Sequence, residues 1–250
     1  MTTYWERTHA RFWRPCDAGL EIPADTSPSD WIAAHLHPGT YEVHMTAPDC
    51  FDAYTRIFFP FHGGHLDERG HLFDAGPIAW TEMAPRNGQV PHALMEEETI
   101  CNRDGEPQPH SSGPGFVTEQ YEALYSVLAR YTSTDDGWFL LWDGFGDIDP
   151  RPFAPQVKVE HQWRSYHLLR GPLAAYQQFP DLPSYFWPGD RAWCLATDTD
   201  FEWAYLGASI PCVDEVIASP LIDAFPTQPA NPARMGMDVI NDPNQEIVRN

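Results

Sequence analysis

Histidine is the residue type in this chain whose spacing best fits metal chemistry. Two short stretches carry the candidates, a His-x-His pair at 35–37 and the sequence HGGHLD at 62–67. The candidate metal ligands are His35, His37, His62, His65 and Asp67. A zinc or iron site needs three or four converging ligands, and a His-x-His pair on a strand can direct both imidazoles to one side. A divalent metal such as zinc is therefore a candidate cofactor, although the chain has neither an HExxH nor a CxxC motif.

Carboxylates supply a second kind of chemistry. The segments DGFGDIDP (143–150) and TDTD (197–200) are rich in aspartate, but neither has the ligand spacing of an EF-hand calcium loop. Two carboxylates could also catalyse hydrolysis as general acid and base. Because the chain has 36 acidic residues, such pairs arise by number alone. A GxSxG motif is absent, and Cys194 lies in a strand that we expect to be buried, where a thiol is a poor nucleophile.

The segment WPGDRAWCLATDTDFEWAYLGAS, from Trp187 to Ser209, holds the candidate binding residues. They are Trp187, Asp190, Arg191, Asp198, Asp200 and Glu202. Alternating side chains over 192–198 and 201–207 predict two paired strands, stabilised by cross-strand aromatic pairs. In such a hairpin the aspartates of the TDTD turn bond turn amides, and Arg191 pairs with Asp190 or with the turn.

Large aromatic residues cluster at two places in the sequence, and these clusters could lie exposed at the surface. These are Trp5, Phe12 and Trp13 near the N-terminus, and Tyr185, Phe186 and Trp187 before the hairpin. Aromatic side chains inside an acidic rim are typical of a protein-binding face. The alternative is that they close the edge of the core.

The charge balance is the strongest feature of the composition. Fifteen basic residues against 36 acidic ones give a net charge of −21, and the isoelectric point is about 4.6. Such a field repels nucleic acid and anionic membranes and speeds the encounter with a basic protein. Acidity that only keeps the protein soluble is the alternative explanation.

Cysteine usage and hydropathy bear on the compartment. The five cysteines are widely spaced and odd in number, which favours free thiols in a reducing cytoplasm. The first residues, MTTYWERTHARFWRP, lack the apolar core of a secretory signal, and no apolar run approaches the roughly 20 residues of a membrane span. We therefore expect a cytoplasmic protein.

The pattern of elements predicts an α+β fold with a mostly antiparallel sheet and a few packed helices. The clearest helix is TEQYEALYSVLARYT, which begins at a Thr118 cap and carries an apolar stripe at three- and four-residue steps. We expect further helices after Ser29 and at 212–219. The expected strands are 41–45, 137–144, 163–171 and the two arms of the hairpin. We predict one domain over 1–250, with a possible subdomain seam in the loop-rich 85–115 region.

Several of these segments resemble a family of acidic, Trp-rich, uncharacterised bacterial proteins from high-GC genomes. The resemblance covers residues 51–61 and about 117–226. It is carried by AYTRIFFPF, GWFLLWDGFG, SYHLLRGPL, the Trp187–Ser209 segment and CVDEVIASPLIDAFP. This chain has Phe59 where the family has a histidine, and LGAS where the family has VGGS. The resemblance implies a shared compact fold and carries no activity.

Charge and missing catalytic motifs together favour a binding protein. We expect a non-enzymatic intracellular protein without a cofactor, whose acidic surface neutralises a basic protein partner, as an immunity protein does for a toxin. The alternative is a metal-assisted or carboxylate-driven hydrolase that uses the early histidines.

Overall fold

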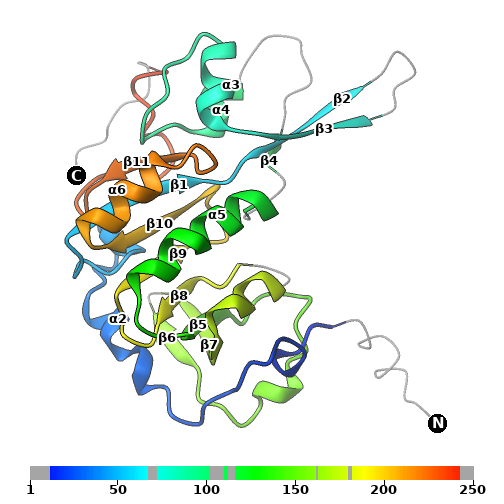
Figure 1. The fold of residues 1–250 in the computed structure, drawn as a ribbon, viewed down its shortest axis with the longest axis vertical. Helices are drawn as coiled ribbons and strands as arrows, with labels where there is room; N and C mark the ends of the chain where they lie inside the picture. The colour runs from blue at the N-terminus through cyan, green and yellow to red at the C-terminus, as the bar shows by residue number, and fades with distance from the viewer. Residues whose placement is uncertain are drawn as a thin grey trace.

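An eight-stranded antiparallel sheet organises the chain, whose computed structural model describes residues 12–66, 72–101, 110–111, 116–161, 163–179 and 182–242 (Figure 1). The strand order is β11-β1-β10-β9-β8-β5-β7-β6. The strands are β1 Ala53–Phe58, β5 Asp136–Trp142, β6 Val159–His161, β7 Arg164–Pro172, β8 Tyr185–Pro188, β9 Trp193–Thr197, β10 Trp203–Ala208 and β11 Ala224–Thr227. The predicted α+β class with an antiparallel sheet is confirmed.

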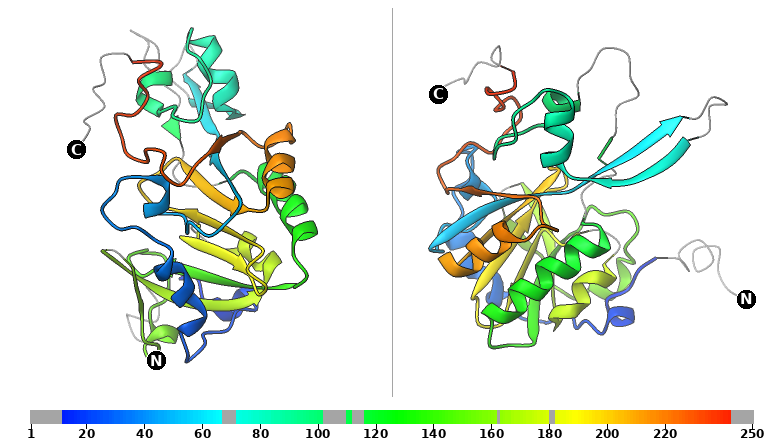
Figure 2. Two further views of the ribbon diagram at one scale, coloured as in Figure 1. Left: turned by 90° about the vertical axis from the view of Figure 1, so that its left-hand side faces the viewer. Right: turned by 45° about the horizontal axis from the view of Figure 1, so that its top comes forward.

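Two helices, α5 (Thr118–Leu128) and α6 (Ile210–Ala218), lie side by side over one face of this sheet (Figures 1 and 2). The apolar stripe predicted for α5 is its buried face, since Tyr121, Leu124 and Leu128 are at most 6% exposed. The helix begins after Val117 and not at a Thr118 cap. The indole nitrogen of Trp193 donates to the carbonyl of Leu128 at 3.1 Å, which joins β9 to the end of α5.

The sheet is buried on both faces, because side chains of alternate residues in β9 and β10 enter two different apolar cores. Trp193 and Leu195 pack with α5 and α6, whereas Cys194 and Ala196 pack on the opposite face. The opposite core is closed by α2 (Asp30–Ala34) and α3 (Trp80–Arg86). Burial on both faces explains why these strands carry so few charged residues.

A smaller antiparallel sheet, β3-β2-β4, adjoins the main one. Its strands are β2 Phe61–Leu66, β3 Leu72–Ile78 and β4 His110–Ser111. Figure 2 shows β2 and β3 extending away from the main sheet. Of the stretch expected to be loop, 85–115, Pro85 and Arg86 end α3, Glu97–Cys101 forms α4 and 110–111 forms β4.

The remaining described elements are short. They are the 3-10 helices η1 Pro15–Ala18, η2 Ser27–Ser29, η3 Val43–Met45, η4 Ala129–Tyr131, η5 Arg151–Phe153 and η6 Leu173–Gln178. The prediction of a strand at 41–45 is wrong, because Tyr41 adopts a left-handed φ of 56° and the chain then turns into η3. No helix in the described part of the chain has the length and apolar character needed to cross a membrane.

Candidate functional site

The aromatic residues before the hairpin are interior residues. Tyr185, Phe186 and Trp187 form β8 and are 3%, 2% and 1% exposed. Because β8 lies between β9 and β5, its side chains enter the cores on the two faces of the sheet. Trp13 is half-buried and packs on Phe179, with ring centroids 4.9 Å apart. Of the two predicted alternatives, closure of the core therefore holds for Tyr185, Phe186 and Trp187. Phe12 and Trp13 are half-buried, and Trp5 lies outside the described residues.

Asp190 and Arg191 lie at the start of the hairpin and serve its local structure. The Asp190 carboxylate accepts hydrogen bonds from the Thr132 hydroxyl at 2.9 Å and the Ser133 amide at 2.7 Å. Arg191 has a left-handed φ of 57°, and its guanidinium lies 5.5 Å from the ring centroid of Trp31. Among the described ion pairs, none joins Arg191 to Asp190 or to the TDTD turn.

The acidic turn at the other end of β9 pairs with a different arginine. Arg164, in β7, donates to Asp198 and to Asp200, each at 2.8 Å. Glu202 is half-buried just before β10, and its carbonyl accepts from the Phe59 amide at 2.9 Å. The six candidate residues of the hairpin thus divide between a buried strand and the two ends of β9, and they do not converge on one site.

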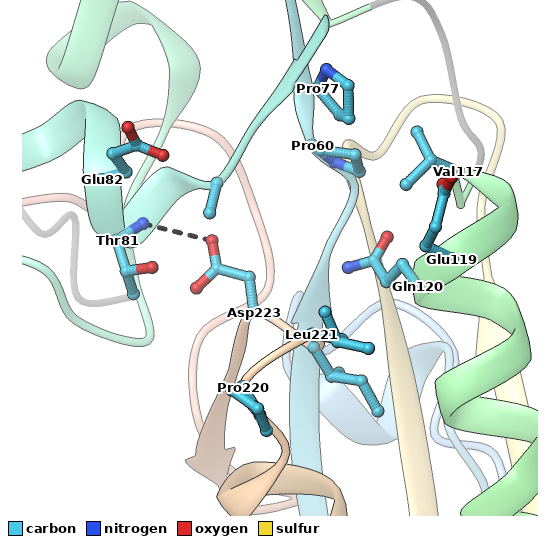
Figure 3. Close-up of a pocket in the computed structure, with 12 residues that line it drawn as sticks. Pro60, Pro77, Thr81, Glu82, Val117, Glu119, Gln120, Pro220, Leu221 and Asp223 are labelled. Carbon is cyan, nitrogen blue, oxygen red and sulfur yellow. Dashed lines mark hydrogen bonds between the residues drawn. The ribbon is translucent and has the colours of Figure 1, made fainter.

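A cavity of about 290 Å³ lies between α3, the start of α5 and the segment that leads into β11 (Figure 3). Its lining consists of apolar residues with a few acidic and amide groups: Pro60, Pro77, Ala79, Thr81, Glu82, Val117, Glu119, Gln120, Pro220, Leu221, Ile222 and Asp223. Apolar walls with a few polar groups are typical of a ligand pocket. We call this cavity the acidic pocket.

Asp223 is the buried carboxylate of the acidic pocket, with 8% of its surface exposed. Its Oδ2 accepts hydrogen bonds from the backbone amides of Trp80 at 2.5 Å and Thr81 at 3.2 Å. Its Oδ1 is buried and has no hydrogen-bond partner within the described residues. Burial raises the pKa of the Asp223 carboxyl, although the backbone amides of Thr81 and Trp80 and the nearby hydroxyl of Thr81 act to lower it.

Gln120, on the opposite wall, presents a second acceptor without a partner. It is 4% exposed, and its Nε2 donates to the carbonyl of Phe58 at 2.8 Å. That hydrogen bond fixes the amide and leaves Oε1 buried, with no partner in the described ranges. A buried acceptor without a donor costs about 1–3 kcal/mol, so both oxygens favour a ligand that donates hydrogen bonds.

The charge of the acidic pocket has one sign. Glu82, Glu119 and Asp223 belong to the lining, and no lysine, arginine or histidine is among its described residues. Arg86 pairs with Glu82 along α3 and is itself exposed. Glu119 is exposed at the rim, so the lining combines a buried carboxylate with a negative entrance.

A second cluster, the imidazole cluster, brings two predicted histidines to a shared carboxylate. Asp49 lies 2.7 Å from Nε2 of His37 and 3.2 Å from Nδ1 of His35. The rings of His37 and His44 stack with centroids 4.2 Å apart. Partial burial acts to raise the pKa of Asp49, but the hydrogen bonds from the two histidines outweigh it and the pKa is lowered.

His37, His44 and Asp49 form the set that could hold a metal ion, since one ligand atom from each lies within 4.8 Å of the others. His62 and His65 lie in β2, but their side chains are not among those described, and Asp67 lies outside the described residues. The sequence alone does not single out His44, Asp49, Gln120 or Asp223, because none of them belongs to a short motif.

Comparison with family models, curated proteins and solved structures finds no match to this chain.

Proposed function

We propose that this protein is a non-enzymatic binding protein that holds a basic protein partner, and that the acidic pocket receives a cationic side chain of that partner. One observation carries the proposal. Two residues that line one cavity, Asp223 and Gln120, each carry a buried side-chain oxygen without a hydrogen-bond partner among the described residues. Every charged residue in the described part of the lining is acidic.

The pocket chemistry favours an arginine or lysine side chain. These residues combine an apolar stem with a charged head that donates several hydrogen bonds. The walls formed by Pro60, Pro77 and Leu221 suit the stem, and the Asp223 carboxylate suits the head. The planar guanidinium of arginine offers five N–H donors, more than the ammonium of lysine, which suits a pocket with unpartnered oxygens.

The net charge of −21 acts at longer range. An acidic protein attracts a basic partner before contact, and this attraction weakens as salt screens it. We therefore expect association to be faster and tighter at low ionic strength. Binding in the pocket itself should respond less to salt, because Asp223 is buried.

The experiment compares the immobilised protein with two variants, each challenged with lysate of its own cells at low and high salt. Asp223→Asn keeps an oxygen to accept the amides of Trp80 and Thr81 but removes the pocket's buried charge. Asp214→Asn makes the same charge change on the exposed side of α6 and serves as the matched control.

We expect the native protein and Asp214→Asn to retain a basic protein at low salt, and Asp223→Asn to retain much less of it. If the native protein retains no basic protein at low salt, the proposed function fails. Equal retention by all three proteins would show that the charge of Asp223 does not contribute to binding of the partner.

The imidazole cluster supports a second candidate, a metal-assisted hydrolase. His37, His44 and Asp49 could hold an ion that activates a water molecule. A carboxylate-driven hydrolase would instead use Asp223, whose raised pKa suits a general acid. Metal analysis of protein purified without a histidine tag tests the first candidate, which fails if no stoichiometric ion is found. An assay of hydrolysis by the native protein and by Asp223→Asn tests the second candidate.

A further inference from the structure

We propose that His37, His44 and Asp49 bind one divalent ion of the zinc class, with His35 as a positioning residue for Asp49. The inference develops the ion site of the metal-assisted candidate. It does not rest on the proposed binding function, since it uses neither the acidic pocket nor a protein partner.

The spacing of the three side chains fits one ion. Their ligand atoms lie within 4.8 Å of one another. Zinc bonds of about 2.0–2.2 Å in a tetrahedral arrangement separate the ligand atoms by roughly 3.4 Å. Small side-chain rotations would therefore suffice. The ion would take the place of the proton between Nε2 of His37 and Oδ2 of Asp49, which now lie 2.7 Å apart.

Backbone hydrogen bonds hold the ligands together before any ion binds. The amide of His37 donates to the carbonyl of His44 at 2.9 Å, and the amide of Asp49 donates to the carbonyl of His35 at 3.0 Å. The amide of His44 also donates to the carbonyl of Pro229 at 2.9 Å. These bonds fix the segments that carry all three ligands, so less conformational entropy is lost when the ion binds.

The neighbouring groups orient the ligands. Nδ1 of His35 lies 3.2 Å from Oδ1 of Asp49, which leaves Oδ2 for the ion. Oε2 of Glu42 lies 2.8 Å from Nε2 of His44, as a carboxylate lies beside many metal-bound histidines. Residues of this kind fix the ring orientation and raise the basicity of the ligand.

The donor set selects the class of ion. Two imidazole nitrogens and one carboxylate oxygen suit zinc and its neighbours, whereas calcium and magnesium prefer oxygen ligands alone. His37 is exposed, which leaves room for water to complete the coordination.

The experiment titrates Zn²⁺ into tag-free, chelator-treated full-length protein by calorimetry, and records the absorption spectrum with Co²⁺. The variants are His37→Gln, His44→Gln and Asp49→Asn. Asp52→Asn is the matched control, because it makes the same charge change at an exposed residue of the same segment. Thermal unfolding of each variant verifies that it is folded.

We expect one Zn²⁺ per chain, with affinity at least about tenfold weaker in each ligand variant and unchanged in Asp52→Asn. His35→Gln should weaken binding by less than the ligand variants do. Lowering the pH should also weaken binding, because protons compete for the imidazoles. Co²⁺ should give the visible absorption of a tetrahedral site, and His37→Gln should remove it.

Two results would overturn the proposal. One is the absence of Zn²⁺ binding at millimolar concentration, and the other is unchanged binding in the His37→Gln/His44→Gln double variant, which would locate the ion elsewhere. Asp223→Asn should bind Zn²⁺ normally, so failure here is distinguishable from failure of the proposed function.

Discussion

The guanidinium carbon of Arg56 lies 3.4 Å from the ring centroid of Trp203, so a buried cation of β1 stacks on an aromatic side chain of β10. The same guanidinium donates to the carbonyls of Ala93 at 2.7 Å and Met95 at 3.1 Å. Arg56 is 3% exposed, and burial lowers its pKa to about 10, which still leaves it charged at neutral pH. One side chain thus joins the main sheet to the segment before α4.

We predict that Arg56→Lys destabilises the fold by about 2–4 kcal/mol. Lysine keeps the charge but cannot stack on Trp203 while donating to two carbonyls in different directions. Urea unfolding measures the loss. Arg191→Lys, an exposed arginine over Trp31, should change stability by less than about 0.5 kcal/mol. If Arg56→Lys lost as little stability as Arg191→Lys, the contacts of Arg56 would not support the fold.

Arg164 should stabilise the hairpin turn through a small network. It donates to Asp198, Thr199 and Asp200, each at 2.8 Å. We expect Arg164→Gln to lose about 1 kcal/mol, and less at high salt, because part of the effect is screened. Thermal unfolding at two salt concentrations measures this.

Arg170→Gln is the control for that experiment. It removes an exposed ion pair with Asp136, which should contribute little. Equal effects of the two substitutions would contradict a special role for the Arg164 network.

The hydrogen bonds of Asp149 predict that the folded protein loses stability in acid. Its buried carboxylate accepts hydrogen bonds from Arg151 at 2.6 and 2.8 Å and from Arg14 at 3.1 Å. The hydrogen bond from the Arg151 side chain is the main cause that lowers the pKa of Asp149 to about 2, below the value of roughly 3.9 in the unfolded chain. The contribution is therefore complete above about pH 4 and is lost as the pH falls toward about 2.

Urea unfolding of Asp149→Asn across that range tests the sign. The variant should be less stable than the native protein by about 2 kcal/mol near neutral pH, and the difference should shrink in acid. Asp214→Asn, at an exposed site, should differ little at any pH. A difference for Asp149→Asn that stays constant with pH would contradict this account.

The thiols should react with an alkylating reagent in an order that the fold determines. Cys16 and Cys50 are exposed, whereas Cys194 and Cys212 are buried. Burial raises the pKa of Cys194 and also raises that of Cys212, to about 12, so neither forms thiolate at neutral pH. Mass spectrometry after brief alkylation should find Cys16 modified first. Cys50 should follow more slowly, because partial burial raises the pKa of its thiol. Rapid modification of Cys194 in the folded protein would contradict the burial of β9.

Local sequence patterns predicted those elements whose structure is determined mainly by burial of apolar side chains. The stripe of Tyr121, Leu124 and Leu128 has helical spacing, and the helix forms with that face buried. The alternation along 192–198 and 201–207 predicted the hairpin, whose strands β9 and β10 pair antiparallel. The segment 41–45 also alternates, but the left-handed backbone of Tyr41 and the bonds from Val43 and His44 to 229–231 override that pattern.

The candidate sites were less accessible to sequence reasoning, because they depend on contacts between distant segments. Asp223 and Trp80 are more than a hundred residues apart in the sequence, and no motif predicts their contact. Gln120 did carry a signal, since it lies one turn before Leu124 on the buried side of α5. A polar residue on an apolar face indicates either an internal hydrogen bond or a ligand. Asp49 follows His37 too distantly to form a motif, although the two side chains meet.

The most direct test of the acidic pocket is nuclear magnetic resonance of the ¹⁵N-labelled protein during titration with a short arginine peptide and its citrulline counterpart. The amides of Trp80 and Thr81 bond Asp223, and the side-chain amide of Gln120 lies on the opposite wall, so all three report on the pocket. We predict saturable shifts of these signals with arginine, with a dissociation constant on the order of 1 mM for a single residue. The shifts should be absent with citrulline and in Asp223→Asn. Equal shifts with arginine and citrulline, or none at the three reporters, would contradict a cation-binding pocket.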